Sequence, residues 1–343
     1  MANPVLTAAI DALAARRDLS VDEAADVLAE IMGGNASEVQ TAAVLVALRT
    51  KGETVDELVG LATTMRRLAT PVDAGRADLI DTAGTGGGRP TFNVSTTAAL
   101  IAAGAGCAVA KHGNRSATGL SGSADVLEAL GVRIDLSPGD VARCVRDVGF
   151  GFMFAPAHHG ATRFVVPVRK ELAVRTIFNF LGPLTNPAGA RRQLIGVSDR
   201  SFLETIAGAL ARLGAVRALV VSSADGLDEM STSGTTRVVE VDGGELRRYE
   251  VRAPDVGLAE ARFDDVAGGT PDANARTARR ILAGEPGPER DLAVLNAGAA
   301  ILVAGRAATL EEGVRAAEAA IDEGRAAGAL DRLVGLTQEL SPA

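Results

Sequence analysis

The chain contains 343 residues, of which 47% are hydrophobic and 23% charged, and its formal net charge is −8. This length supports a large buried core and about two domains. The negative charge argues against general nucleic-acid binding, although a local basic pocket for a small anion stays open. No apolar run reaches the roughly 18 residues of a membrane helix, and residues 1–13 lack a signal-peptide pattern. We therefore expect a cytoplasmic protein.

The chain has two cysteines, Cys107 and Cys144. Their number and spacing support neither a disulfide framework nor a zinc site. We expect two buried thiols in a reducing compartment.

Residues 1–70 are typical of helices alone. Three patterns predict helix starts, because each offers a side-chain oxygen to the free amides of a first turn. They are Ser20-x-x-Glu23, Ser37-x-x-Gln40 and Thr54-x-x-Glu57. Glycines at 33, 34 and 52 and Pro71 stand where such helices should end. Residues 1–72 therefore predict a small helical domain, which we expect helices within about 163–190 to join.

From residue 77 onward, strand and helix patterns alternate. The predicted strands are 77–82, 107–111, 132–135, 150–155, 193–198 and 217–222. The predicted helices are 95–104, 122–130, 138–148, 201–213 and 272–283. We expect an edge hairpin within 231–250, a loop over 251–270, and helices over 272–336 with a break at 284–288. This alternation predicts an α/β domain over 73–343 with a mainly parallel sheet, whose ligands gather at the carboxyl ends of the strands.

A glycine-rich stretch from Asp81 to Thr96 follows the first predicted strand and enters a helix. Four glycines in five positions remove Cβ atoms, so backbone amides can turn inward around an anion. Ser95 and Thr96 stand at the helix start, where hydroxyls and free amides suit a phosphate. A tight turn capped by Ser95 or Thr96 is the structural alternative.

A second polar stretch, from Lys111 to Asp125, also follows a predicted strand. It combines the charges of Lys111 and Arg115 with several hydroxyls and with glycines that allow close backbone approach. Two such loops at strand ends favour a polyphosphate or sugar-phosphate site. A solvated loop with helix caps is the alternative, since turn residues are common in loops.

Two further stretches carry candidate chemistry. Residues 154–187 contain two of the three histidines and Arg169, which could pair bidentately with a substrate carboxylate or lie solvated on a helix. Asp228-Glu229 follows the predicted strand 217–222. Adjacent carboxylates there suit Mg²⁺ beside phosphates, whereas an acidic surface loop would explain them in isolation.

In this order, the stretches resemble the anthranilate phosphoribosyltransferases over nearly the whole chain. The matching motifs are Gly84-Thr85-Gly86-Gly87, Thr91-Phe92-Asn93-Val94-Ser95-Thr96, Lys111-His112-Gly113-Asn114-Arg115, Gly122-Ser123-Ala124-Asp125, Arg175-Thr176-Ile177-Phe178-Asn179, Leu181-Gly182-Pro183-Leu184 and Asp228-Glu229. The resemblance implies a helical domain and an α/β domain of the nucleoside phosphorylase type, and a homodimer joined through the small domain. It also implies transfer of the phosphoribosyl group of 5-phosphoribosyl 1-pyrophosphate (PRPP) to the amine of anthranilate, with Mg²⁺, the second step of tryptophan synthesis from chorismate.

The resemblance also assigns residues by position. Those implied to bind PRPP are Gly84, Gly86, Gly87, Gly88, Thr91, Asn93, Val94, Ser95, Thr96, Lys111, His112, Gly113, Asn114, Arg115, Ser116, Ala117, Thr118, Gly119 and Ser123. Those implied to line the anthranilate path are Gly84, His112, Asn114, His159, Arg169 and Gly182, and those implied to hold Mg²⁺ are Ser95, Asp228 and Glu229. No catalytic acid or base is implied, because an aromatic amine is already a nucleophile.

The chain departs from the family pattern in three places. Gly88-Arg89-Pro90 replaces a loop that is usually one residue longer and begins with Asp, so we expect Mg²⁺ and pyrophosphate to be held differently, with Arg89 meeting a phosphate. Thr118-Gly119 stands where two serines are common, and His159-Gly160 where His-Pro is common.

Two other functions compete with this hypothesis. A nucleoside phosphorylase of the same fold is disfavoured by Arg169 and by the Asp228-Glu229 pair. A nucleic-acid-binding relative that has lost catalysis would need a basic groove, which the net charge of −8 opposes.

Overall fold

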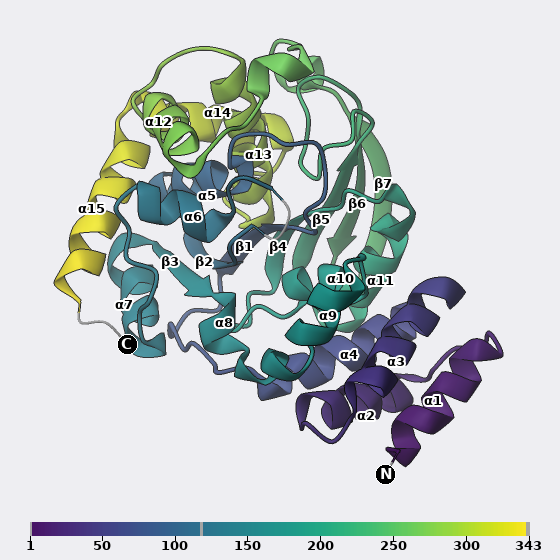
Figure 1. Cartoon of the computed structure of the whole chain (residues 1–343). Helices are drawn as coiled ribbons and strands as arrows, with labels where there is room; N and C mark the ends of the chain where they lie inside the picture. Colours follow the sequence, from purple (N-terminus) through teal and green to yellow (C-terminus); the bar gives the residue numbers. More distant parts are fainter. Residues whose placement is uncertain (1, 117–118, 341–343) are drawn as a thin grey trace.

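The computed structural model describes residues 2–116 and 119–340, and it consists of a helical bundle beside a larger α/β body (Figure 1). The bundle contains α1 (Pro4–Ala14), α2 (Val21–Met32), α3 (Glu38–Lys51) and α4 (Val55–Leu68). The predicted capping boxes form at α2 and α4. At α3 only half of the box forms, because the Gln40 side chain bonds to the backbone of Asn3 instead.

A seven-stranded sheet forms the centre of the α/β body, with the strand order β3-β2-β1-β4-β5-β6-β7. The strands are β1 (Leu79–Gly84), β2 (Ala108–Gly113), β3 (Phe150–Phe154), β4 (Arg192–Gly196), β5 (Arg217–Ser223), β6 (Thr236–Asp242) and β7 (Glu245–Val251). The first five are parallel, and β6 and β7 form the antiparallel edge hairpin. The predicted fold class is therefore confirmed.

The sheet separates two apolar cores. Successive side chains of β5 alternate between them: Leu219 and Val221 face one core, whereas Ala218 and Val220 face the other. The first core is covered by α5 (Val94–Gly104), α6 (Ser123–Ala129), α7 (Pro138–Val148), α12 (Pro271–Leu282), α13 (Pro288–Val303), α14 (Leu310–Asp322) and α15 (Arg325–Glu339). The second core joins α11 (Leu203–Arg212), which follows the 3-10 turn η2 (Arg200–Phe202), to the helical bundle.

The segment between β3 and β4 folds back onto the bundle (Figure 1). It contains α8 (Ala155–His158), η1 (Gly160–Phe164), α9 (Val166–Leu172) and α10 (Phe178–Leu184). Helix α9 contacts α3, and α10 contacts α4. The buried side chains of α9 and α10 belong to the same core as those of the bundle.

Two sequence predictions about secondary structure are wrong. Residues 132–135 form no strand; Val132 and Ile134 are buried, but the amide of Arg133 bonds to Thr337 Oγ1 rather than to a neighbouring strand. Residues 251–270 are not all loop, since they contain the 3-10 turns η3 (Ala253–Val256) and η4 (Phe263–Val266).

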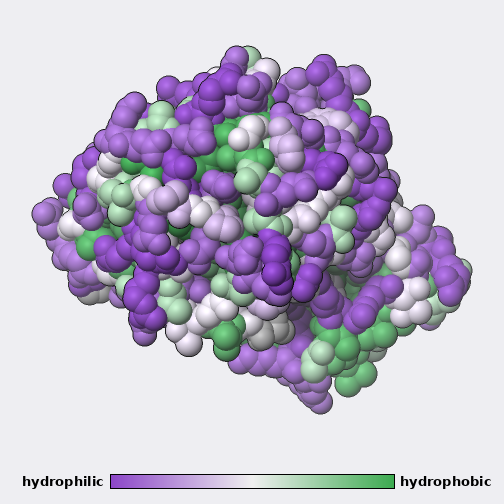
Figure 2. Space-filling view, turned by 90° about the horizontal axis from the view of Figure 1, so that it is seen from above, coloured by the Kyte–Doolittle hydropathy of each residue, from purple (hydrophilic) through white to green (hydrophobic). Residues whose placement is uncertain are grey.

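The helical bundle carries exposed apolar side chains. Val39 and Val46 of α3 are 79% and 44% exposed, and Phe164, Val166 and Val174 of the adjoining segment are also exposed. Figure 2 shows a hydrophobic area on the lower right of the face drawn, the side on which Figure 1 shows the bundle.

The hydropathy of the helices and the state of the two cysteines can now be described. Across residues 2–116 and 119–340, no helix has the length and apolar character needed to cross a membrane. Cys107 and Cys144 are buried free thiols, and burial raises their pKa values to about 12 and about 11.

Candidate active site

The carboxyl ends of β1, β4 and β5 meet at one edge of the sheet. Strand β1 lies between β2 and β4, so the chain leaves it toward one side and later returns on the other. This is the switch point at which open α/β sheets bind ligands. The loops that follow β1, β4 and β5 supply the glycine-rich stretch, Ser198 and the Asp228-Glu229 pair.

The glycine loop is held by hydrogen bonds to a neighbouring backbone and to a neighbouring side chain. Gly86 and Gly87 adopt left-handed conformations with φ of 67° and 78°, which residues other than glycine rarely adopt. The amide of Thr85 donates to the Gly196 carbonyl over 2.8 Å, and the amide of Gly86 donates to Asp228 Oδ2 over 2.8 Å. The loop is therefore attached both to the end of β4 and to the acidic loop.

The close approach of Asp228 requires glycine at two strand ends. A Cβ atom on Gly196 would lie 1.4 Å from the Asp228 carbonyl oxygen, and one on Gly84 would lie 2.6 Å from Asp228 Oδ2. Ser95, Thr82, Asp228 and Glu229 line the same small cavity. The structure thus brings together the three residues that the sequence comparison implied for a metal.

Burial raises the pKa of both carboxyl groups at this cavity, although each residue keeps part of its surface exposed. For Glu229 the charge of Asp228 raises the pKa further, while Lys111 lowers it. Neither carboxylate forms a salt bridge within the described part of the chain. Two adjacent, poorly solvated carboxylates beside a hydroxyl are a donor set that suits a hard divalent cation.

Lys111 lies beneath the glycine loop with 1% of its surface exposed. Its ammonium donates to the Thr82 carbonyl, to Thr82 Oγ1 over 3.2 Å and to Ser95 Oγ over 3.3 Å. Burial lowers its pKa to about 8, against the opposing effects of Asp81 and Glu229. Lys111 therefore supports the floor of the site and supplies a positive charge from below.

At the start of α5, asparagine side chains bond to neighbouring segments and leave the first amides of the helix without a side-chain cap. Asn93 is the N-terminal cap residue, but its side chain bonds to Ser121 and to Asn274 Nδ2 instead of capping the helix. Ser95 and Thr96 lie in the first turn, so the alternative of a turn capped by either hydroxyl is wrong. Val94 is fully buried, and Thr91 pairs with Ala267 in an isolated bridge.

The second loop runs from the end of β2 to α6. The carboxylate of Asp125 accepts from the amides of Ser116 and Gly122 and pairs with Arg115, which also pairs with Glu128. Asn114 accepts from the Arg115 amide through Oδ1, and its carbonyl accepts from Ser123 Oγ. Gly113 packs against Ser123, and the amide of Gly119 donates to Ser116 Oγ over 2.7 Å. The predicted residues Ala117 and Thr118 lie outside the described residues.

Two histidines lie on the opposite face of β2, His112 near the end of the strand and His159 just after α8. His112 and His159 lie with ring centroids 5.0 Å apart, and His112 Nδ1 lies 3.2 Å from the Gly182 carbonyl oxygen. Burial lowers the pKa of His112 to about 3 and that of His159 to about 4. Both rings are therefore neutral at pH 7, and their buried Nε2 atoms have no partner in the described residues.

Arg169 is half-buried in α9, and desolvation lowers its pKa. Its guanidinium carbon lies 5.4 Å from the centroid of the Phe178 ring, and the arginine forms no salt bridge within residues 2–116 and 119–340. Within the described residues, no hydrogen bond joins Arg169 to His112. His158, the neighbour of His159, instead hydrogen-bonds to the Thr70 carbonyl, which is a structural contact.

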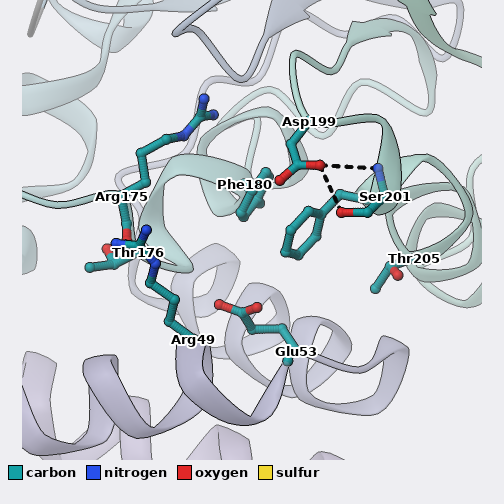
Figure 3. Close-up of a pocket in the computed structure, with 10 residues that line it drawn as sticks. Arg49, Glu53, Arg175, Thr176, Phe180, Asp199, Ser201 and Thr205 are labelled. Carbon is teal, nitrogen blue, oxygen red and sulfur yellow. Dashed lines mark hydrogen bonds between the residues drawn. The ribbon is translucent and has the colours of Figure 1, made fainter.

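A separate cavity of about 420 Å³ lies between the bundle and the α/β body (Figure 3). Arg49 and Glu53 line it from the bundle, and Asp199 and Ser201 line it from the segment after β4. Arg175 connects this cavity to the glycine loop, since it donates to Ser198 Oγ over 2.8 Å and Ser198 Oγ donates to the Gly86 carbonyl.

Sequence reasoning missed several residues that shape the site. Ser198 and Gly196 stand at the end of a predicted strand, which was the available signal for both. Asp81 is buried and accepts from Asn186 Nδ2 and from the His112 amide, and burial raises its pKa. No local pattern marks this contact, because it joins residues 105 positions apart.

Models of one class of proteins, the glycosyl transferases, match most of the chain. Residues 7–69 match the helical bundle domain of the glycosyl transferase family, and residues 76–327 match its a/b domain. Both parts of the fold therefore belong to one known architecture.

Relatives narrow this class. The chain is 52% identical to an anthranilate phosphoribosyltransferase of Rubrobacter xylanophilus over 98% of this chain and 99% of the relative. The crystal structure of the Thermus thermophilus enzyme superposes with a TM-score of 0.91 at 44% identity, covering 96% of this chain and 99% of that one. The Saccharomyces cerevisiae enzyme in complex with PRPP and Mg gives a TM-score of 0.90 at 27% identity, covering 98% of both chains. The chain belongs to the anthranilate phosphoribosyltransferase family.

Proposed function

We propose that this protein transfers the phosphoribosyl group of PRPP to the amine of anthranilate, which gives N-(5-phosphoribosyl)anthranilate and pyrophosphate. One observation carries the proposal: the glycine loop, Ser95 and the Asp228-Glu229 pair meet at the switch point of the sheet. The Rubrobacter relative named for this reaction, at 52% identity, supports the same substrates.

PRPP would bind along the glycine loop and the loop after β2. The amides of the glycine loop, the first turn of α5 and Lys111 suit a pyrophosphate group, because amides and an ammonium together stabilise negative charge. The backbone from Gly113 to Ser116, with Gly119 and Ser123, suits the 5-phosphate. Arg115 would act mainly by organising that loop, since its guanidinium is already paired with Asp125 and Glu128.

Mg²⁺ would be held by Asp228, Glu229 and Ser95. The fit rests on the small cavity that these three residues line together, and burial there raises the pKa of both carboxyl groups. When bound, the cation supplies charge neutralisation to a departing pyrophosphate without a proton transfer. The yeast relative in complex with PRPP and Mg supports this choice of cation.

Anthranilate would lie on the His112 side of β2. Neutral histidines and the Gly182 backbone suit an aromatic ring, and Arg169 suits its carboxylate through two parallel hydrogen bonds. Asn114 and Gly84 would border both substrates. A yeast relative in complex with 4-fluoroanthranilate, at 26% identity and a TM-score of 0.88, supports an aromatic acid as the acceptor.

The mechanism follows from orientation and charge. The amine of anthranilate attacks C1 of the ribose with its own lone pair, so no side chain has to act as a base. The glycine loop and Lys111 hold the leaving group in a fixed position, and the histidine side keeps water away from the developing positive charge on the ribose. The neutral histidines do not compete for the proton that the product amine releases to solvent.

The decisive experiment follows anthranilate fluorescence after the protein is mixed with PRPP and Mg²⁺. Fluorescence should fall, and pyrophosphate should appear in equal amount. An unchanged signal, with loss for another aromatic amine, would reassign the acceptor. Arg169→Lys should raise KM for anthranilate about tenfold, since a lysine cannot form the paired hydrogen bonds, and should leave KM for PRPP unchanged.

Three coarser features accompany this proposal. A homodimer joined through the small domain is supported by the exposed Val39 and Val46 of α3, and sedimentation of Val39→Asp against wild type tests it. The division into residues 1–72, with helices from 163–190, and residues 73–343 is supported by the core that α9 and α10 share with the bundle. A cytoplasmic location is supported by the two free thiols, which suit a reducing compartment.

A further inference from the structure

We propose that Arg89 is a substrate-binding residue that contacts the pyrophosphate group of PRPP. Stacking on Phe263 holds its guanidinium group in position. The inference rests on the proposed function, because it requires a polyphosphate at the glycine loop. It adds a cationic ligand from the segment where this chain departs from its family.

The first argument is steric. A Cβ atom on Gly88 would lie 2.7 Å from Asp228 Oδ1 and 2.9 Å from the Gly226 carbonyl oxygen. Position 88 therefore has no room for a side chain unless the acidic loop moves, so an acidic residue there would displace Asp228. Arg89 is consequently the first residue after Thr85 whose side chain can reach from the loop.

The second argument concerns how Arg89 is held. Its amide donates to the Gly226 carbonyl over 3.0 Å, which ties its backbone to the acidic loop. Its guanidinium carbon lies 3.7 Å from the centroid of the Phe263 ring in η4. A cation over an aromatic face is stabilised there, and the stacked plane keeps its N–H groups free at the edges.

The third argument compares the cations around the site. Arg115 is paired with two carboxylates, Arg175 donates to Ser198, and Lys111 is buried below the loop. Arg89 is exposed and forms no salt bridge within the ranges that the structure describes. An arginine that is stacked, exposed and unpaired retains its full capacity for a bidentate bond to a phosphate.

These observations assign complementary roles to two groups of side chains around the glycine loop. Asp228 and Glu229 present negative charge to the small cavity, where a divalent cation fits. The side chain of Arg89 packs against Gly226 of the acidic loop and on Phe263, and it presents positive charge directly. A pyrophosphate at the glycine loop would be neutralised partly by this side chain.

The test is calorimetric titration of the full-length protein with inorganic pyrophosphate and with PRPP, each with Mg²⁺ and without anthranilate. Arg89→Gln should weaken both ligands about 10- to 100-fold, the effect of losing a charge-assisted hydrogen bond. Phe263→Leu keeps the charge but removes the stack, and should weaken both ligands about two- to fivefold. Arg276→Gln, an equal charge change on the exposed face of α12, is the matched control and should bind as wild type does.

The outcomes separate the two proposals. Equal affinities of Arg89→Gln and wild type for pyrophosphate would overturn the role of Arg89. Weaker binding of PRPP by Arg89→Gln than by wild type, with no loss of anthranilate fluorescence in wild type, would overturn the acceptor and support Arg89. A wild-type protein that binds neither phosphate ligand would overturn both. Circular dichroism of each variant detects misfolding, and Arg89→Lys, which keeps a positive charge, should recover part of the lost affinity.

Discussion

Burial shifts the pKa values of carboxyl groups and of histidines in opposite directions on the two faces at the end of β2. On one face, Lys111 lies beside Ser95 and near Glu229, and burial raises the pKa values of Asp228 and Glu229. On the other face, burial lowers the pKa values of His112 and His159 to about 3 and about 4. Burial therefore disfavours the charged form of the carboxyl groups on one face and leaves the histidine rings of the other face neutral at pH 7. Adjacent residues of one strand, Lys111 and His112, therefore lie on a charged and an uncharged face of the sheet edge.

The largest effect should come from removing charge on the carboxylate side. Glu229→Gln or Asp228→Asn should lower kcat/KM for PRPP about 100-fold or more, because charge on the leaving group loses its stabilisation. KM for anthranilate should stay within about twofold, and steady-state kinetics over a range of Mg²⁺ concentrations measure both. Asp242→Asn, an exposed carboxylate at the hairpin turn, is the control. A large rise in the KM for anthranilate would break the separation of the two faces.

A methyl group at position 196 should disrupt the carboxylate side of the site without removing a charged group. The added Cβ would collide with the Asp228 carbonyl oxygen, so Gly196→Ala should displace Asp228 and cost about 1–3 kcal/mol of stability. We expect turnover to fall about tenfold or more, since small displacements of reacting groups are costly. Thermal unfolding and kinetics against Gly335→Ala, where the added methyl group meets open space, measure both effects. Wild-type turnover in Gly196→Ala would contradict the close approach.

The charge of Lys111 should appear in the pH profile. Its pKa is lowered to about 8, so the ammonium is present below pH 8 and is lost as the pH rises through that value. We expect kcat/KM for PRPP to fall above about pH 8, by up to about tenfold per pH unit. Lys111→Met should be less active at pH 7 and should lack this decrease. A decrease that persists in Lys111→Met would assign the ionisation to another group.

The smallest effect concerns stability and has opposite signs on the two faces. The raised pKa values of Asp228 and Glu229 mean that the folded state binds protons more tightly, so stability falls as the pH rises above the unfolded carboxyl pKa. The lowered pKa values of His112 and His159 mean that stability falls as the pH drops below about 6.5. Urea unfolding between pH 5 and 9 without metal measures both slopes.

Two variants separate these slopes. Glu229→Gln should weaken the loss of stability with rising pH, and His112→Asn should weaken the loss with falling pH. Mg²⁺ should raise stability where the two carboxyl groups are ionised, because it binds only the folded state. Parallel changes in both variants would mean that the two faces are not independent.

The sequence predicted most elements because their signals are local. The start of α7 and the edge hairpin were readable from a proline after a serine and from an Asp-Gly-Gly turn. The false strand at 132–135 had the right alternation, but the amide of Arg133 bonds to Thr337 Oγ1 and not to a strand. Periodicity reports which side chains face a core and does not report which backbone groups pair.

The candidate site was predicted from signals that are local in the same way. Glycines, hydroxyls and paired carboxylates at strand ends mark a phosphate and metal site, and parallel strands bring their carboxyl ends together. The contact of Gly196 with Asp228, the link from Arg175 through Ser198 to Gly86, and the stack of Arg89 on Phe263 were not readable. Each joins segments that are distant in sequence.

The sequence by itself determined the fold class and the family, and it predicted the residues of the candidate site. Local capping, hydrophobic periodicity and motif order contain that information. The tertiary structure alone decided which groups are charged and which are free, because ionisation and pairing depend on burial and on neighbours across the fold. Gly88 and Arg89 are the clearest example. Their identities indicate a departure from the family pattern, and only the packing of Asp228 and Phe263 gives that departure a physical meaning.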